Sequence, residues 1–426
     1  MLIGTAISNV VRLISTIILT RILDPSAYGV VGILSSIGFT VVMLTDVGIF
    51  SYVIRHQHAT DSTFLDRVWT LRLIRCLFLM ALVILIAPVL AWALEKPITL
   101  AIIAYSLTFG AEAISSMAFA TAVRERQLAR LAVLDALPQL LTLPITILLA
   151  LWLHSYWALI IAMIFATLLN AMLSYALFPH AKRKLRYSRE TARDLWSFGR
   201  SVSAASIIHL VLSQADKIVL GRILSLSSFG LYNISSTISG SVKIFNSSYS
   251  QRILYPRFVE FKDRESYEVS DIFYSVGKHT RIIYGFFSGL ILFCSELIIT
   301  ILYDERFFGA SSFLFILLIG NIFSLSISAA TQLLLALGHT THIFRMNLAR
   351  LCFFIVFGGL GLYLFGSKGL VAAVSGTDII AQLYCWVALS RVGIFSVRKE
   401  TPFWLAALVG CGIGWFINKT GIVLIS

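Results

Sequence analysis

Long apolar blocks recur along the whole 426-residue chain, and they limit what it can fold into more than any other feature. Each block has about 18–25 residues, the length that a helix needs to cross a hydrocarbon layer of ~30 Å. Lipid cannot hydrogen-bond a polypeptide backbone, so such blocks have to form helices or a closed barrel. The short alternating segments of a barrel are absent, and charged residues make up only 13% of the chain. The sequence therefore predicts an all-α integral membrane protein.

Thirteen blocks qualify as membrane spans, which places the chain among proteins of 12–14 transmembrane helices. The first block lacks a basic n-region and a small-residue cleavage site, so we expect it to be a span rather than a signal peptide. The predicted spans are 2–21, 28–53, 73–94, 98–122, 131–153, 156–178, 200–221, 228–250, 274–302, 311–337, 346–366, 369–391 and 403–424.

Lysine and arginine residues gather on one side of this predicted membrane. The loops after even-numbered spans hold 25 of the 34 basic residues, whereas the opposite side holds six. Basic loops stay in the cytoplasm, so we expect a multi-pass protein of the cell inner (cytoplasmic) membrane with a cytoplasmic N-terminus. The net charge of +13 has the same origin, and its spread over short loops argues against a nucleic-acid partner.

Two segments of the chain repeat each other without gaps. Residues 17–30 (IILTRILDPSAYGV) align with residues 218–231 (IVLGRILSLSSFGL), which pairs Arg21 with Arg222 and Gly29 with Gly230. Each copy begins a run of six spans, and an even number of spans returns the chain to the same side of the membrane. The repeat therefore predicts two parallel six-helix lobes related by a pseudo-two-fold axis along the membrane normal.

The repeat also predicts how the chain is divided. An amphipathic linker is expected because its arginines can face water while Leu195, Trp196 and Phe198 lie in the membrane interface. The predicted parts are an N-terminal six-helix lobe (1–178), a cytoplasmic linker (179–199), a C-terminal six-helix lobe (200–391) and an additional C-terminal helix (392–426).

Motifs for catalysis and for metal binding are absent from the sequence. It contains no P-loop, HExxH or GxSxG motif and no His/Cys group with ligand spacing, so we expect no enzyme activity, catalytic residue, cofactor or metal. The GCGIG segment at 410–414 is typical of close packing between membrane helices instead.

Ionisable residues inside the spans indicate an internal polar cavity, because each costs about 2.5–3.5 kcal/mol at the centre of a bilayer. The basic residues are Arg12, Lys217 and Lys243 within spans, with Arg21 and Arg222 at the outer ends of spans 1 and 7. The acidic residues are Asp46, Glu112 and Asp216, together with Glu296 and Asp378, which we expect near helix ends.

This charge pattern has two interpretations. In the first, Arg12, Lys217 and Lys243 line a central cavity and bind an anionic group such as a phosphate, with Arg21 and Arg222 at its outer rim. The acidic residues Asp46, Glu112 and Asp216 then hold these cations or carry coupling protons. In the second, the charges pair internally between helices, Asp46 with Arg12 and Asp216 with Lys217 or Lys243. Basic residues outnumber acidic ones in the first hairpin of each repeat, which favours the first interpretation.

Both hairpins of the repeat resemble a known family. LTRILDP (19–25) followed by Tyr28-Gly29 resembles the first-hairpin signature of oligosaccharide and polysaccharide flippases, and QADK (214–217) with LGR (220–222) and FGLY (229–232) resembles the second. This family is the polysaccharide transporter branch of the multidrug/oligosaccharidyl-lipid/polysaccharide exporter superfamily. The specific motifs are confined to the hairpins, while the order of spans is similar over nearly the whole chain.

The resemblance implies a flippase for undecaprenyl-pyrophosphate-linked oligosaccharide in O-antigen, capsule or exopolysaccharide biosynthesis, working by alternating access of two lobes. It implies lipid-linked oligosaccharide and membrane lipids as partners, with a polysaccharide polymerase and glycosyltransferases. One alternative is a cation-coupled multidrug antiporter of the same superfamily, which would need a cavity dominated by carboxylates. A membrane enzyme would need a larger outer loop, and a channel or scaffold would not need the repeat.

Overall fold

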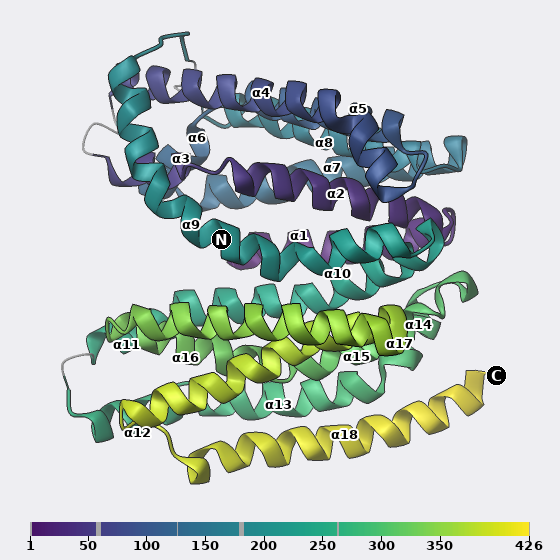
Figure 1. Cartoon of the computed structure of the whole chain (residues 1–426), viewed down its shortest axis with the longest axis vertical. Helices are drawn as coiled ribbons and strands as arrows, with labels where there is room; N and C mark the ends of the chain where they lie inside the picture. Colours follow the sequence, from purple (N-terminus) through teal and green to yellow (C-terminus); the bar gives the residue numbers. More distant parts are fainter. Residues whose placement is uncertain (1, 57–60, 126, 179–182, 262–263, 426) are drawn as a thin grey trace. The chain divides into compact units, whose positions relative to one another are not determined.

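The computed structural model describes residues 2–56, 61–125, 127–178, 183–261 and 264–425, and every regular element in these ranges is helical (Figure 1). The predicted all-α class is therefore confirmed. Contacts between residues divide the chain into two compact units, Met1–Gly230 and Leu231–Ser426, each with buried apolar clusters of its own.

The first unit is built from helices that bury apolar side chains against one another, with Tyr52, Phe64 and Val68 in one of its buried clusters. Its helices are α1 (Leu2–Thr20), α2 (Pro25–Leu44), α3 (Ile49–Arg55), α4 (Ser62–Leu94), α5 (Thr99–Ala113), α6 (Ala118–Arg124), α7 (Leu128–Leu153), α8 (Trp157–Ala176), α9 (Arg189–Ile223) and the start of α10 (Leu226–Tyr249).

The second unit contains the rest of α10 and ten further elements. These are η2 (Ser250–Leu254), α11 (Tyr255–Glu260), α12 (Ser266–Ser275), α13 (Lys278–Phe293), α14 (Ser295–Leu302), η3 (Glu305–Phe307), α15 (Ala310–Asn321), α16 (Ser324–Ala336), α17 (Thr340–Arg391) and α18 (Val397–Ile425). Helices α13 and α18 lie side by side (Figure 1), and a Cβ at Gly410 would come within 2.0 Å of the Phe286 carbonyl oxygen. The predicted packing role of GCGIG is therefore confirmed.

Seven stretches of helix among the described residues are long and apolar enough to cross a membrane, and the bent pair α13–α14 brings the number to eight. The chain is therefore a multi-pass membrane protein, while the count of thirteen spans stays a prediction. Helix α10 lacks an apolar window of this kind because serines interrupt it throughout. One of the seven stretches, α17, has 52 residues, long enough to cross a membrane twice.

Several predicted spans are interrupted. The span predicted at 28–53 ends at Leu44, and the chain turns at Gly48, which has a φ of 65° that favours glycine, before α3 begins. The span predicted at 274–302 bends by 70° between α13 and α14. These breaks are invisible to a pattern of apolar residues, because apolar side chains continue through them.

The break between the predicted spans 346–366 and 369–391 is confirmed. Gly366 has φ 61° and ψ −145°, a conformation that residues with a side chain avoid, and it turns α17 back on itself. Gly361 and Gly369 let the two halves touch, since a Cβ at Gly369 would lie 2.0 Å from the Gly361 carbonyl oxygen. The second half of α17 packs against α15, where the Ser375 hydroxyl accepts a hydrogen bond from the Gly320 amide.

The predicted linker differs from the observed structure. Residues 189–199 form the first turns of α9, which runs without a break to Ile223. Ser188 caps this helix by accepting a hydrogen bond from the Thr191 amide, a typical start signal. The boundary between the compact units lies later, inside α10. The six-helix lobes 1–178 and 200–391 therefore stay a prediction.

The two copies of the repeat meet at their glycines. A Cβ at Gly29 would lie 1.9 Å from the Leu226 carbonyl oxygen, and a Cβ at Gly230 would lie 1.8 Å from the Pro25 carbonyl oxygen. Pro25 aligns with Leu226 in the repeat, so the contact is reciprocal. The first turns of α2 and α10 therefore cross with local two-fold symmetry.

Candidate functional site

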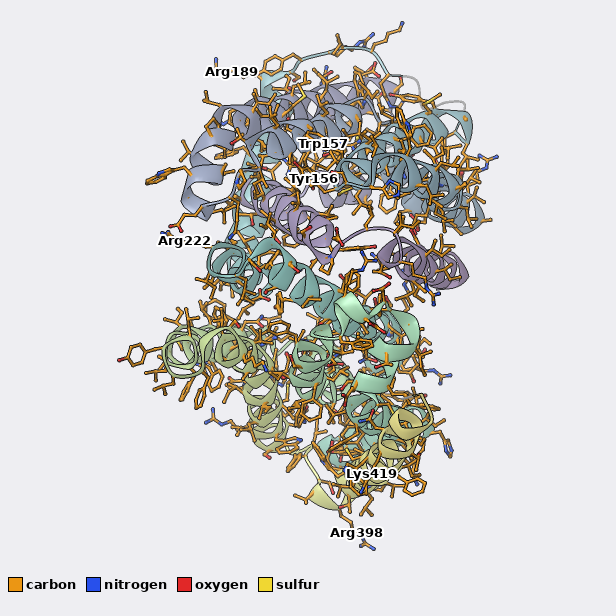
Figure 2. The ribbon with its side chains drawn as sticks, turned by 90° about the vertical axis from the view of Figure 1, so that its right-hand side faces the viewer. Tyr156, Trp157, Arg189, Arg222, Arg398 and Lys419 are labelled. Carbon is orange, nitrogen blue, oxygen red and sulfur yellow. The ribbon has the colours of Figure 1, made fainter. Side chains whose placement is uncertain are left out.

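Four of the five predicted substrate-binding cations lie in the first unit. Arg12 is exposed on α1, Arg21 is exposed in the turn after it, and Lys217 is half-buried on α9. Arg222, in the last turn of α9, extends away from the ribbon (Figure 2), and its Nη2 lies 2.9 Å from Glu95 Oε1. Both partners of this ion pair are more than half exposed, so it adds little stability.

The two aspartates of the predicted site have different surroundings. Asp216 is buried on α9, next to Lys217 in the sequence. Asp46 was expected inside a span but lies in the turn between α2 and α3, where its Oδ1 accepts a hydrogen bond from the Gly48 amide at 2.9 Å. That expectation is wrong because α2 ends at Leu44. The pairing of Asp46 with Arg12 stays a prediction.

The fifth predicted cation, Lys243, belongs to an ion triad in the second unit. Its Nζ lies 2.5 Å from Asp378 Oδ2, and Arg350 Nη2 lies 2.8 Å from the other oxygen, Oδ1. The Asp378 side chain is only 6% exposed, whereas that of Lys243 is 38% exposed. One carboxylate therefore holds two cations, and the triad keeps a net charge of +1.

The position of Asp378 differs from the predicted one. It was expected near a helix end, but it lies in the middle of the second half of α17, opposite Gly320 of α15. A Cβ at Gly320 would come within 2.9 Å of Asp378 Oδ2, so the absent side chain leaves room for the carboxylate. Glu296, by contrast, is exposed in the first turn of α14, as predicted.

A polar cluster lies near this triad. The Tyr284 hydroxyl donates to the Asn321 carbonyl oxygen at 2.5 Å, and the Asn321 amide donates to the Ser239 carbonyl oxygen at 2.9 Å. The side chains of Asn246 and Ser324 also hydrogen-bond to each other. The side-chain oxygens Oδ1 of Asn246 and of Asn321 are buried without a partner. Tyr284 and Asn321 border a cavity of about 340 Å³, so this interior has unused acceptors beside open space.

A second polar cavity, of about 420 Å³, lies within the first unit. Arg72 is buried beside it, 3.3 Å from Glu112 Oε1, and its guanidinium lies 5.3 Å from the centre of the Phe50 ring. Asp135 and Asn170 also line this cavity. Arg72 is thus a partner for the predicted charge pairing of Glu112. A coupling role for Glu112 stays a prediction.

Arg72 and Arg350 were not among the charges expected inside the spans, but both lie inside helices. Both helices begin earlier than predicted, α4 at Ser62 and α17 at Thr340, so each arginine lies about ten residues inside its helix. A helix-start signal was present for α4, since Asp61 accepts a hydrogen bond from the Thr63 amide.

Within the described part of the chain, no three His, Cys, Asp or Glu residues come together as a metal site. The candidate site contains cations, carboxylates and amides carried by helices. Such groups can bind an anionic or strongly polar ligand.

Comparison with known proteins agrees with this architecture. The chain is 24% identical over 257 residues to the succinoglycan biosynthesis transport protein ExoT of Rhizobium meliloti (strain 1021), covering 60% of this chain and 51% of that protein. The chain thus matches about half the length of this curated relative.

Two solved structures have a similar fold. The lipid II flippase MurJ in an inward closed conformation superposes with a TM-score of 0.74 at 14% identity, covering 98% of this chain and 92% of that one. The eukaryotic MATE transporter AtDTX14 superposes with a TM-score of 0.59 at 15% identity and 96% coverage of both chains. At these identities the likeness establishes the fold.

A family model described as "Polysaccharide biosynthesis protein" matches residues 18–312, which is more than half of the chain and includes both copies of the repeat. The chain therefore belongs to this polysaccharide biosynthesis family, as the hairpin signatures suggested.

Proposed function

We propose that this protein is a flippase that moves an undecaprenyl-pyrophosphate-linked oligosaccharide from the cytoplasmic to the outer leaflet of the inner membrane. Membership of the polysaccharide biosynthesis family, the similarity to a succinoglycan transport protein and the fold all support a transporter of this kind. The observation that carries the proposal is the ion triad, in which Lys243 and Arg350 share one carboxylate. The protein acts as a transporter and performs no catalytic step.

The geometry of the triad suits an anionic ligand. Arg350 can neutralise Asp378 by itself, which frees the partly exposed Lys243 to contact a phosphate oxygen. Lys217 is half-buried on α9, where a cation favours an anionic partner. Contacts between ammonium groups and phosphate are about twice as strong as neutral hydrogen bonds. A pyrophosphate head offers the negative charge that suits each of these lysines.

One observation favours the alternative, a cation-coupled multidrug antiporter. The cavity of the first unit carries two carboxylates, Glu112 and Asp135, which could bind a proton or a cationic drug. However, Glu112 already pairs with the buried Arg72. This pair lowers the negative potential of that cavity. The triad of the second unit has a net positive charge of its own, so the flippase is the better-supported function.

Alternating access requires a contact that opens. We assign this role to the crossing of α2 and α10, where Gly29 and Gly230 bring two backbones into direct contact. The crossing lies beside Arg222, on the side that the distribution of basic loops assigns to the outer face. A bulkier side chain at either glycine should hold this contact open.

The orientation can be tested with reporter fusions. A fusion after Lys184 should report cytoplasm, and a fusion after Lys96 should report the outer side, because basic loops remain in the cytoplasm. A cytoplasmic signal at Lys96 would refute the assigned orientation.

Polymer export in cells tests the function itself. Arg12→Ala, Lys217→Ala and Lys243→Ala should abolish export at matched expression and leave the protein in the membrane. Lys419→Ala, which removes an exposed cation of α18 (Figure 2), is the matched control and should export normally. Full export by all three variants would contradict the proposed role of these cations.

A further inference from the structure

A basic pocket in the second unit shares no lining residue with the ion triad. It has a volume of about 480 Å³ and lies where α12 ends and where α13 and α18 begin. Its lining residues include four cations, Lys278, Arg281, Arg398 and Lys399, and one carboxylate, Asp271. We propose that this pocket binds the phosphate headgroup of an anionic membrane phospholipid.

The fold holds the walls of this pocket in place. Gly277 has a φ of 78°, which lets the chain turn sharply from α12 into α13. The Tyr274 hydroxyl accepts a hydrogen bond from the Ser396 amide, and the Ser270 hydroxyl donates to the Ile394 carbonyl oxygen. Burial raises the pKa of Tyr274 to about 12, so this hydroxyl stays neutral. The start of α18 is thereby fixed against α12.

Arg281 is the buried member of the pocket. It is 7% exposed, and its guanidinium lies 5.0 Å from the centre of the Phe273 ring and 5.2 Å from that of Tyr274. Its Nη2 bonds Glu400 Oε1 at 2.9 Å, while its Nε is buried without a partner. A buried guanidinium with an unused donor beside a cavity suits an oxygen ligand.

The charges around the pocket do not cancel. Glu400 pairs with Arg281, and Asp271 pairs with Lys399 at 2.6 Å. Within the described part of the chain, Lys278 and Arg398 make no ion pair, and both are exposed at the mouth. Figure 2 shows Arg398 extending away from the ribbon. The pocket therefore has a net charge of +2, which fits an anionic headgroup.

The position of the pocket favours a lipid over a free phosphate. It opens at the start of α18, a helix long and apolar enough to cross a membrane. Leu405, Leu408 and Val409 follow on α18 within three turns and are each more than half exposed, as expected for side chains that face acyl chains. Basic pockets between membrane helices at a cytoplasmic surface bind anionic headgroups by the same combination of contacts.

The test compares two double variants of the full chain in detergent, titrated with phosphatidylglycerol and observed by native mass spectrometry. Lys278→Gln/Arg398→Gln keeps the side chains polar and removes the two unpaired cations. Each cation near an anionic headgroup is worth about 1 kcal/mol, so the affinity should fall roughly 30-fold. Arg252→Gln/Arg257→Gln removes two exposed cations outside the pocket and should stay within about threefold of the wild type.

Three results would overturn the inference: an unchanged affinity in the pocket variant, an equal fall in both double variants, or displacement of phosphatidylglycerol by millimolar inorganic phosphate. The last would identify a site for free phosphate instead of a lipid. Phosphatidylcholine, which has no net charge, should bind both double variants and the wild type equally. The proposal does not depend on the transported substrate, because lipid binding is measured without transport.

Discussion

Replacing Asp378 with Asn removes the charge that holds Lys243 and Arg350. Asp378 is only 6% exposed, and its two oxygens lie 2.5 and 2.8 Å from the two cations. Breaking a buried ion pair by removing one partner costs about 3–5 kcal/mol, because the remaining charge stays buried. Both cations here are partly exposed, so the lower end, about 3 kcal/mol, applies.

Lys243→Met is the matched comparison. It leaves Asp378 paired with Arg350 and removes a cation whose side chain is 38% exposed, so it should cost only about 1 kcal/mol. At roughly 2–4 °C per kcal/mol for a unit of this size, Asp378→Asn should lower the Tm by roughly 6–12 °C and Lys243→Met by roughly 2–4 °C.

Thermal unfolding in detergent, followed by tryptophan fluorescence, measures both effects, and Trp386 lies on the same helix as Asp378. The reasoning is refuted if Asp378→Asn melts no lower than Lys243→Met. The comparison also separates stability from binding. Lys243→Met should remain folded and lose the anionic ligand, whereas Asp378→Asn should lose stability first.

Three other contacts lead to measurable effects. Gly230→Ala places a Cβ against a backbone carbonyl of α2 and should cost about 1–3 kcal/mol, whereas Gly240→Ala, in open space, should melt like the wild type. Arg281→Met should lower the free energy of unfolding by about 3–5 kcal/mol, because it leaves Glu400 buried and unpaired. The double variant Arg281→Met/Glu400→Leu should recover most of this stability in thermal unfolding. A double variant no more stable than Arg281→Met would contradict the pairing. Burial raises the pKa of Tyr274 from 10.0 to about 12, so its contribution to stability is complete below pH 10 and disappears between pH 10 and 12. Tyr274→Phe should therefore reduce the alkaline fall in Tm, and an unchanged fall would exclude this contribution.

Sequence patterns could predict the features that depend on residue type alone. Apolar length indicated membrane helices, and the gap between two apolar blocks marked the turn at Gly366. The aligned glycines of the repeat pointed to equivalent positions, and the structure shows why they are glycines, since Gly29 and Gly230 each touch a backbone carbonyl.

Features that depend on where a helix begins or breaks could not be predicted in this way. Arg350 was not among the predicted interior charges because it lies near the start of the predicted span 346–366, whereas the helix itself starts ten residues before it at Thr340. Asp46 looked like a charge inside a span because apolar residues continue past the turn at Gly48. The pairing of Asp378 with two cations could not be predicted from the sequence, because only the fold brings α10 and both halves of α17 together around this carboxylate.

Flipping by the purified protein in vesicles tests the central claim most directly. A fluorescent undecaprenyl-pyrophosphate oligosaccharide is incorporated, and a membrane-impermeant quencher reports how much label reaches the outer leaflet over time. The wild type should move the label faster than vesicles without protein. Lys243→Met should be slower by roughly 10- to 100-fold, the equivalent of about 1.5–3 kcal/mol for one charged hydrogen bond. Equal rates in wild-type and protein-free vesicles, or an undiminished rate in Lys243→Met, would contradict the claim that this protein flips a pyrophosphate-linked glycan through its cations.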